Sequence, residues 1–509
     1  MSNVRIAGNG EREPASPTAA LPLPLIVRLG DALEESGVGY CHWKSNAAID
    51  RSLAGDNDLD LLISRRDSAR FSELASALGF VRVQRPGDAP RGIESFYGFD
   101  VDTDRLVHVH AHYQLVLGDD RTKNYRVPIE DAYIRSAEPA QVLRLPSPEF
   151  EWIVFVIRMT LKYCTPDEIL WNALKGRRAG PSRTERRELE YLTKRTDRQR
   201  ADAVLAEHLP CVEQELFADC VDALTFQVSF GQKLSAARRL ETALQPFARR
   251  SRQADRALRV SRRFAAAGTR RMKRARRSRL AAGGAIVGIM GGDGSGKTTA
   301  LSAVESLLGS EFDVRLVHLG KPRWSATTYA ARGALKAVGL TAEGIGRRAR
   351  LAPARRFADL VASYRPLVWL LCTARDRQHT YRRAHRFAID GGLVLCDRYP
   401  HPRLASMEVP LIASRTAGVL DGRLVKAMSS LEQRYHRSIA PPELLVVLRL
   451  DPEIAVARKT EERPESVRAR GAEVWNIDWR AVGAHVIDAS QPQETVAREL
   501  KALVWSAIS

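Results

Sequence analysis

Hydrophobic and polar positions follow two different periods in the first part of the chain. Apolar residues recur at every third or fourth position over residues 25–36 and 71–78, which predicts two helices that end at glycines. Short apolar or alternating stretches, which are typical of strands, occupy residues 38–43, 58–63, 95–101 and 106–113. The mixture predicts an α/β or α+β domain over residues 21–147.

The pattern becomes helical after this domain. Residues such as Trp152, Val156 and Met159 keep the helical period, and strand-like alternation is missing. Residues 148–250 are therefore predicted to form a helical connector. Residues 1–20 are rich in Gly, Pro, Ala and Ser, and they are predicted to be disordered.

Strands and helices alternate again in the last part of the chain. Such alternation is typical of a parallel sheet whose ligands lie at the carboxyl ends of the strands. The predicted strands cover residues 286–290, 313–319, 393–396, 444–450 and 485–487. Residues 285–509 are thus expected to form a second domain, and the expected fold class of the chain is α/β with a C-terminal parallel sheet.

Charge is distributed unevenly along the chain. The net charge is +19, and no acidic residue occurs between Asp255 and Asp293, although residues 256–279 contain a run of arginines with one lysine. Residues 251–284 are predicted to be a basic linker. The alternative is an electrostatic handle that binds an anionic membrane surface or nucleic acid.

Other features of the sequence exclude several classes of protein. No stretch reaches the roughly 18 apolar residues of a membrane-spanning helix, and Glu11 and Glu13 stand where a signal peptide would be basic. The six cysteines are scattered and form no C-x-x-C pair, which argues against a zinc cage or a disulfide scaffold. A cytoplasmic protein is expected.

A glycine-rich motif follows the first predicted strand of the second domain. Residues 291–299 match G-x-x-x-x-G-K-[ST], in which glycines let the backbone wrap around phosphate oxygens and the next helix contributes its N-terminal amides. Lys297 is expected to reach the β- and γ-phosphates of ATP, and the Thr298 hydroxyl to bind Mg²⁺. The predicted nucleotide-binding residues are Gly291, Asp293, Gly294, Ser295, Gly296, Lys297, Thr298 and Thr299.

Three segments of residues 285–509 resemble the family of thymidylate kinase and related nucleoside monophosphate kinases, which are P-loop proteins. The first is the glycine-rich motif itself. The second is Ala374–His379, followed at the family's distance by Gly391–Tyr399. The third is Leu450–Lys459, which runs into an arginine-rich stretch. The resemblance implies a P-loop kinase domain that uses ATP and Mg²⁺.

The resemblance also implies roles for individual residues. Arg377 and Arg398 would hold the phosphate of the acceptor, and Asp397 would lie near Mg²⁺ and the glycine-rich motif. A mobile lid would follow Arg458 and close over the transferring phosphoryl group, which needs cations to stabilise its charge. The candidate lid arginines are Arg463, Arg468 and Arg470.

Two segments depart from the family pattern. Where the family has Arg-Glu-Pro after its second strand, this chain has Val317–Trp324, and where the family has Ala-Tyr-Gln, it has His401–Pro410. Thymidylate is therefore expected to be a poor acceptor, and the acceptor is a small anionic molecule, either a nucleotide or a sugar phosphate. The alternatives are a kinase of a sugar or glycan phosphate in surface-polysaccharide metabolism and a non-catalytic ATP-binding scaffold at a membrane. A homodimer is left open.

Two aspartates lie at the start of a predicted strand in the N-terminal domain. Strand geometry puts Asp58 and Asp60 on one face, where two carboxylates can hold Mg²⁺. The segment Trp43–Ile63 resembles the nucleotidyltransferase fold, which implies a metal site for nucleotidyl transfer. That fold has a third carboxylate on a neighbouring strand. This chain has His108 and His110 there, and both are predicted to join the metal site.

Overall fold

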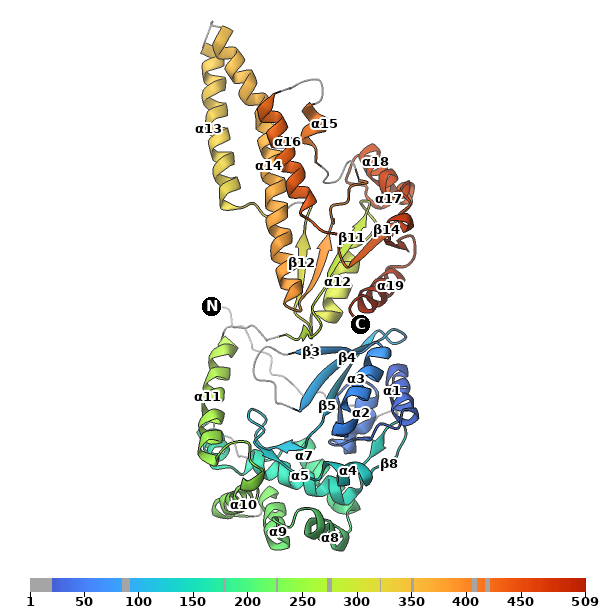
Figure 1. The fold of residues 1–509 in the computed structure, drawn as a ribbon, viewed down its shortest axis with the longest axis vertical. Helices are drawn as coiled ribbons and strands as arrows, with labels where there is room; N and C mark the ends of the chain where they lie inside the picture. Colours follow the sequence, from blue (N-terminus) through green and yellow to red (C-terminus); the bar gives the residue numbers. More distant parts are fainter. Residues whose placement is uncertain are drawn as a thin grey trace, which may run out of the picture. The chain divides into compact units, whose positions relative to one another are not determined.

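The structure is a computed structural model of the chain, and both of its compact units combine helices with β-strands, which confirms the α/β class (Figure 1). The first unit is Met1–Phe80 with Pro90–Arg274, and the second is Val81–Ala89 with Ala275–Ser509. The predicted disordered segment 1–20 lies outside the described residues. These are 21–84, 92–174, 176, 180–225, 228–271, 277–320, 322–348, 352–404, 410–416 and 422–509.

The first unit contains a β-sheet on which Asp58, His108 and His110 lie close together. Its strands lie in the order β1 (Tyr40–His42), β2 (Leu59–Ile63), β5 (Arg105–His112) and β4 (Ile93–Asp100). β2 and β5 are parallel, whereas β1 and β4 run antiparallel to their neighbours. α1 (Pro24–Glu35) and α3 (Ser68–Ala77) share a core with Val107 and Val109 on one face of this sheet. Because side chains alternate along a strand, His108 and His110 lie on the opposite face.

Short elements connect the strands and helices of this sheet region. Two antiparallel ribbons pair β6 with β7 and β8 with β9. The short elements are η1 (Asn46–Ala48), α2 (Ile49–Leu53), η2 (Arg65–Asp67), β6 (Val116–Leu117), β7 (Tyr125–Arg126), α4 (Glu130–Arg135), β8 (Glu138–Pro139) and β9 (Arg144–Leu145).

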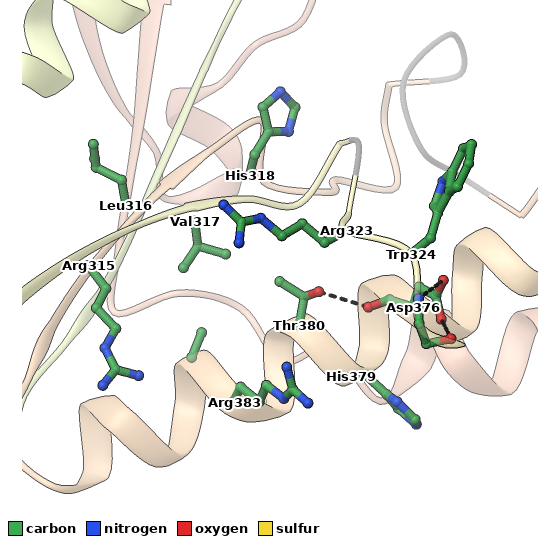
Figure 2. A pocket seen from close by; sticks show the side chains of 12 residues that line it. Arg315, Leu316, Val317, His318, Arg323, Trp324, Asp376, His379, Thr380 and Arg383 are labelled. Atoms are coloured by element: carbon green, nitrogen blue, oxygen red, sulfur yellow. Dashed lines mark hydrogen bonds between the residues drawn. The ribbon is translucent and has the colours of Figure 1, made fainter. Parts of the chain in front are cut away.

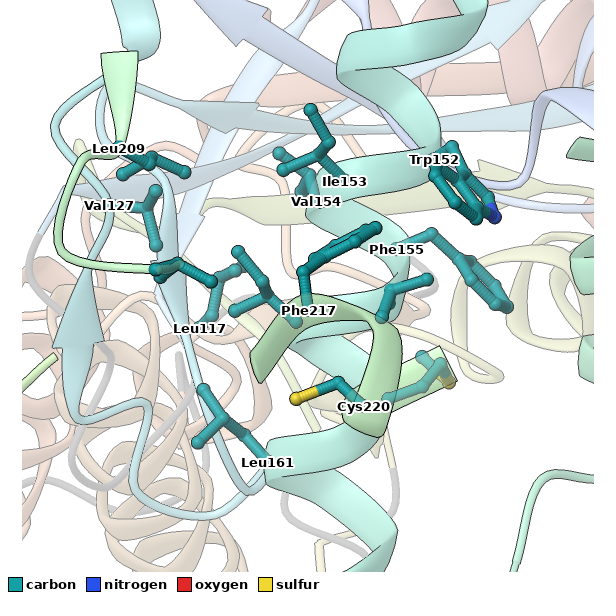
Figure 3. Close-up of a cluster of buried hydrophobic side chains, with 14 of the residues drawn as sticks. Leu117, Val127, Trp152, Ile153, Val154, Phe155, Leu161, Leu209, Phe217 and Cys220 are labelled. Carbon is teal, nitrogen blue, oxygen red and sulfur yellow. The ribbon is translucent and has the colours of Figure 1, made fainter. Parts of the chain in front are cut away.

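Residues 148–250 are helical, as their pattern predicts, but they belong to the first unit rather than connecting two domains. α5 (Pro148–Tyr163) is apolar on nearly every side, so it is buried in the middle of the other helices. Figure 3 shows Phe155 of α5 beside Phe217 in a cluster that also contains Leu62 of the sheet. The other helices are α6 (Pro166–Leu174), α7 (Arg183–Arg195), α8 (Arg198–His208), α9 (Gln214–Leu224), α10 (Phe230–Ala243) and η3 (Gln245–Phe247).

The basic segment is not a linker over most of its length. α11 (Arg252–Arg271) is a helix of the first unit, and its Arg259 and Arg263 are buried. Arg259 lies 3.0 Å from a carboxylate oxygen of Asp167, and Arg263 lies 3.2 Å from one of Asp119. Buried charges need such partners. These two arginines therefore stabilise the fold, and they are not available to bind an anionic membrane surface or nucleic acid. Residues 272–276 of the run lie outside the described residues.

The second unit is built on five parallel strands in the order β12-β13-β11-β14-β15. These strands are β11 (Ile286–Gly291), β12 (Val314–His318), β13 (Leu393–Asp397), β14 (Leu444–Arg449) and β15 (His485–Asp488). β3 (Val81–Gln84) and β10 (Arg279–Leu280) pair antiparallel and do not belong to the parallel sheet. The parallel sheet expected from the alternating pattern is therefore present.

Helices accompany each strand of the parallel sheet. The described residues from Ala326 to Pro366 are helical. They form most of a pair, α13 and α14, that lie side by side (Figure 1). Pro366 lies inside α14, where it removes one helical hydrogen bond. The helices are α12 (Lys297–Leu308), α13 (Ala326–Arg348), α14 (Ala352–Ile389), α15 (Ile412–Thr416), α16 (Arg423–Arg437), α17 (Pro452–Arg458), α18 (Pro464–Trp475), η4 (Arg480–Val482) and α19 (Gln493–Ser506).

Candidate functional site

The parallel strands of the second unit end at one edge of the sheet. β11 ends at Gly291, β12 at His318 and β13 at Asp397. The register pairs Asp397 with Ile289 on one side and with His318 on the other. Because parallel strands share the direction of their carboxyl ends, the glycine-rich loop (residues 291–299) and the residues after β13 meet at this edge.

The glycine-rich loop makes a tight bend between β11 and α12. Gly296 precedes α12 and has a φ of +82°, a left-handed conformation that glycine adopts without strain. A β-carbon at Gly291 would lie 2.6 Å from Ser295 Oγ and 2.7 Å from the Leu448 carbonyl oxygen. Thr298 is exposed in the first turn of α12, where free backbone amides attract an anion. The bend therefore depends on glycine and ends at a helix N-terminus.

Lys297 is the first residue of α12, and its side chain is buried. Its Nζ donates hydrogen bonds to the carbonyl oxygens of Gly291, at 3.0 Å, and Gly292, at 2.8 Å. Burial lowers the pKa of Lys297, and the negative charge of Asp397 opposes that shift. The ammonium group is thus folded back onto its own loop, within electrostatic reach of Asp397.

Asp293 joins the loop to two arginines from other elements. An Arg398 nitrogen donates to Asp293 Oδ1 at 3.0 Å, and Arg470 Nε of α18 lies 3.0 Å from Asp293 Oδ2. Arg398 directly follows β13 and has a φ of +55°, which is unusual for a residue other than glycine and stores strain. Two guanidinium groups therefore converge on the glycine-rich loop.

Asp397 offers a carboxylate oxygen toward the same edge. Its Oδ1 is buried and has no hydrogen-bond partner among the described residues. Its Oδ2 lies 3.7 Å from His318 Nε2, too far for a direct hydrogen bond. A buried carboxylate oxygen of this kind normally has a partner, so Asp397 is suited to bind a cation that lies beside the loop.

The side chain of Arg377 is buried. Its Nε donates to the Leu319 carbonyl oxygen at 2.8 Å, and its side chain is buried against His436 of α16. Burial, and then the charge of Arg377, lower the pKa of His436 to about 4. Arg377 therefore braces the segment that follows β12, and it does not point a free guanidinium group at an acceptor.

The arginines of the predicted lid are placed differently from one another. Arg458 ends α17 and donates to the Ala489 carbonyl oxygen at 3.1 Å. Arg468 forms a two-point ion pair with Glu453, and Arg463 is exposed just before α18. Arg470 alone of the three candidates after Arg458 is bound to a glycine-rich loop residue, namely Asp293.

A second cluster of charged side chains lies on the polar face of the sheet in the first unit. Asp58, His108 and His110 offer ligand atoms that all lie within 4.8 Å of one another. His108 Nδ1 is 2.8 Å from Asp58 Oδ1, and the His108 ring stacks on Tyr97 at a centroid distance of 4.1 Å. The structure therefore brings together three of the four predicted metal ligands.

The fourth predicted ligand, Asp60, is paired with a positively charged side chain of the protein. Lys44 Nζ lies 2.8 Å from Asp60 Oδ1, and His110 and His112 each lie 3.4 Å from the same oxygen. Burial acts to raise the pKa of Asp60, but these histidines and Lys44 lower it well below its usual value. Asp60 is thus a charged carboxylate whose charge is offset inside the protein.

Lys44 and His112 were not among the residues predicted to bind the metal ion. Lys44 follows Trp43 directly, and His112 continues the alternation of His108 and His110, so both were visible in sequence. Their role depends on the pairing of β2 with β5, which sets His110 beside Asp60 and His112 beside Leu62. The positions of Lys44 and His112 beside Asp60 therefore could not be predicted without knowing that β2 pairs with β1 and β5.

Comparisons with known proteins do not assign this chain to a family. No protein-family model and no curated protein matches it. Within the described residues, no helix has both the length and the apolar character that crossing a membrane requires.

Proposed function

We propose that the second unit is an ATP- and Mg²⁺-dependent phosphotransferase that moves the γ-phosphoryl group of ATP to a small anionic acceptor. The observation that supports this proposal is the glycine-rich loop at the carboxyl edge of a parallel sheet, with Lys297 at a helix N-terminus and Asp397 on the next strand. This combination suits phosphate groups, because backbone amides, a lysine and a carboxylate that can hold a metal ion converge on one point.

The residues at this edge fit Mg²⁺ and a nucleotide. Asp397 Oδ1 is a buried oxygen with no hydrogen-bond partner among the described residues, and the Thr298 hydroxyl belongs to an exposed residue at the start of α12. Oxygen ligands of this kind are those that Mg²⁺ prefers. When bound, Mg²⁺ neutralises charge on the phosphates. Lys297 would exchange its two bonds to loop carbonyls for bonds to phosphate oxygens.

Arginines near the loop would stabilise the charge of the transferring group. Arg398 and Arg470 both bind Asp293, so a modest side-chain rotation would move either guanidinium group toward a phosphate. Arg463 belongs to the segment that the family resemblance implies to be a lid, and Arg458 directly precedes that segment. Arg377 would act by holding the backbone at Leu319 in place, which is a positioning role.

Turnover of ATP tests the proposal directly. The full chain would be incubated with ATP, Mg²⁺ and a panel of nucleoside monophosphates and sugar phosphates, and ADP would be measured. We expect ADP that depends on an acceptor in the wild type and in Lys336→Ala, whose lysine is exposed on α13, but not in Lys297→Ala.

Two results of this assay would contradict the proposal. Equal turnover in wild type and Lys297→Ala would remove the glycine-rich loop from the chemistry. ATP binding with no ADP from any acceptor would favour the alternative of a non-catalytic ATP-binding scaffold. Among acceptors, turnover with sugar phosphates alone would favour the glycan-phosphate kinase, and efficient use of thymidylate would show that the departing segments do not alter specificity.

A second proposal concerns the first unit. We propose that Asp58, His108 and His110 bind a divalent metal ion, in a domain that resembles nucleotidyltransferases. Two imidazoles and one carboxylate favour a softer ion such as Mn²⁺ over Mg²⁺. Because Lys44 already neutralises Asp60, that carboxylate would contribute less than the Asp-x-Asp pattern implies.

Calorimetry of the full chain with Mn²⁺ tests this site. We expect saturable binding that Asp58→Ala abolishes and that weakens as pH falls through the titration range of histidine, since only neutral imidazole binds a metal. Asp56→Ala provides a control, because Asp56 is a nearby acid that pairs with Arg105. Unchanged Mn²⁺ binding in Asp58→Ala would show that the aspartate is structural.

A further inference from the structure

A groove opens beside the edge strand of the parallel sheet in the second unit. β12 is the outermost strand, and the groove lies between it, α14 and the loop that carries Arg323 and Trp324 (Figure 2). Its volume is about 730 Å³, which is within the range of sites that bind small molecules. None of the residues predicted from sequence to bind nucleotide or acceptor lines it.

The lining of this groove is strongly basic. Guanidinium groups come from three separate elements, namely Arg315 of β12, Arg323 of the loop and Arg383 of α14, and His318 and His379 join them. Figure 2 shows Arg323 reaching across the groove between the strand and the helix. Planar guanidinium groups bind phosphate and carboxylate oxygens in pairs. The groove is therefore suited to a ligand with more than one anionic group.

The acidic residue of the lining does not cancel this charge. Asp376 is buried, and its carboxylate accepts hydrogen bonds from Ser325 Oγ at 2.8 Å and from Thr328 Oγ1 at 2.6 Å. The backbone N–H of Ser325 donates to it at 3.1 Å. These hydrogen bonds favour the charged form and lower the pKa of Asp376, although burial opposes them. Asp376 thus anchors the loop to α14. The Arg315 guanidinium group stacks on the Phe387 ring at 3.7 Å from its centroid. Arg323 and Arg383 are therefore the arginines best placed for a ligand.

An aromatic ring stands at one end of the groove. Trp324 is 38% exposed, and its ring packs edge-to-face against Trp369 at a centroid distance of 5.2 Å. The Arg332 guanidinium group lies 3.7 Å from the centroid of the Trp324 ring. The indole is therefore held in place while part of its surface stays open, as in sites where a sugar or a base stacks on an aromatic residue.

His318 connects the groove to Asp397 of the candidate phosphotransfer site. His318 lines the groove, and its Nε2 lies 3.7 Å from Asp397 Oδ2. Asp397 is in turn the carboxylate that acts most strongly on Lys297. A ligand in the groove would therefore reach His318 and, through it, the neighbourhood of Asp397 at the carboxyl edge of the sheet.

We propose that this groove binds the acceptor, and that the acceptor is a phosphorylated ring compound with at least two anionic groups. The proposal rests on the proposed phosphotransferase function. In the reaction, an oxygen of the acceptor's dianionic phosphate forms a bond to the γ-phosphorus of ATP. The bond from that phosphorus to the β,γ-bridging oxygen breaks, and ADP leaves with the electron pair. No proton is transferred, because the attacking oxygen is already ionised.

Binding measurements test the groove without relying on turnover. The probes are thymidine 3′,5′-bisphosphate and glucose 1,6-bisphosphate, which represent the two sources of a phosphorylated ring with two anionic groups, and glucose as the uncharged control. We expect at least one phosphate probe to bind the wild type. Arg323→Ala with Arg383→Ala should weaken its binding about tenfold or more, because two charge-assisted contacts are lost. Glucose should not bind measurably.

A matched pair of substitutions provides the control. Arg382→Ala with Arg386→Ala removes the same charge from exposed positions of α14 that do not line the groove. That variant should bind the probe within about twofold of wild type. An equal loss of probe binding in both double variants would show that only the overall charge matters, and it would overturn the proposal. Failure of both phosphate probes to bind the wild type would also overturn it.

Turnover then separates this proposal from the proposed function. Lys297→Ala should keep probe binding while it loses ADP formation. If the wild type forms ADP and the Arg323→Ala, Arg383→Ala variant keeps the same KM for the acceptor, the groove proposal fails and the phosphotransferase proposal stands. If the probe binds through these arginines but no acceptor yields ADP, the assignment of the groove to an acceptor is overturned together with the phosphotransferase.

Discussion

The glycine-rich loop of the second unit and the Asp58 cluster of the first unit are both charged sites on a β-sheet, but they are built differently. The loop is continuous in sequence, and Lys297 is bonded to Gly291 and Gly292 of the same loop. The Asp58 cluster instead joins residues about fifty positions apart, and it exists only because β2 pairs with β5.

This difference affects how far each site can be inferred. In the loop, backbone conformation creates the site, so its sequence motif predicts its geometry. In the Asp58 cluster, side chains from two paired segments create the site, and a further residue, Lys44, changes the local charge by pairing with Asp60. A pattern of carboxylates and histidines therefore predicts a site less reliably than a glycine-rich loop before a helix.

The largest expected effect tests whether the metal site of the first unit depends on buried ion pairs elsewhere in the same unit. Arg263 of α11 is buried with Asp119 and Asp167. We expect Arg263→Ala to destabilise the first unit by about 3–5 kcal/mol, because it leaves buried carboxylates without a partner. Urea unfolding would measure the change. Arg256→Ala, an exposed position of the same helix, should change stability by no more than about 0.5 kcal/mol.

The same variant tests whether the two sites are independent. At a temperature where the first unit of Arg263→Ala is unfolded, Mn²⁺ binding at Asp58 should be lost while ATP binding at the glycine-rich loop remains. Loss of both together would contradict the contrast between a locally built site and one that depends on tertiary structure.

The next effect sharpens the role of Asp397. We expect Asp397→Asn to lower kcat by about a hundredfold to a thousandfold, because it removes charge at the point where the metal and the transferring group would meet. Steady-state ADP release with the best acceptor would measure it. Asp58→Asn should leave kcat unchanged, and a similar loss in that variant would mean that the two sites act in one reaction.

A smaller effect concerns Lys44. Lys44→Met should strengthen Mn²⁺ binding by about tenfold, since it frees the Asp60 carboxylate from an ammonium group 2.8 Å away. Calorimetry would measure the change, with Lys194→Met, an exposed lysine of α7, as control. Weaker binding in Lys44→Met would instead show that the lysine supports the site.

The smallest expected effect concerns pH and His436. Burial and the charge of Arg377 lower its pKa to about 4 in the folded protein, whereas an unfolded histidine titrates near about 6.5. Between these values the unfolded chain binds more protons, so stability falls as pH decreases from about 6.5 toward 4. We expect about 1 kcal/mol from this residue, since it is only partly buried.

Unfolding experiments at pH 7 and pH 4.5 would measure this contribution. His436→Gln should show a smaller loss of stability than wild type over that interval, and the difference between the two isolates this histidine from the titration of carboxylates. An identical loss in both proteins would show that Arg377 and His436 are not coupled in the way that their contact suggests.

Much of the secondary structure could be predicted from sequence. The strand at residues 286–290, the loop after it and the helix with Leu301 and Val304 match β11, the bend and α12. Asp451 caps α17 by accepting a hydrogen bond from the Glu453 amide, as its place before Pro452 predicts. These features depend on neighbouring residues, because period, glycine conformation and helix capping are local properties.

Other features could not be predicted, since they depend on residues far apart in the chain. Charge pattern predicted a linker where α11 buries Arg259 and Arg263, because their partners Asp167 and Asp119 lie in other elements. The resemblance implied a phosphate-binding Arg377, which stays a prediction, and its burial and the hydrogen bond from its Nε to the Leu319 carbonyl oxygen could not be predicted.

The sequence by itself determined the alternation of strands and helices and the glycine-rich loop, because backbone hydrogen bonding and glycine's freedom in φ act over a few residues. Only the tertiary structure decided which charges are paired and which remain for a ligand. Arg323, Arg383 and Arg377 look alike in sequence, yet the first two line an open groove and the third is buried. The physical reason is that burial and ion pairing depend on distance in space, which the fold sets.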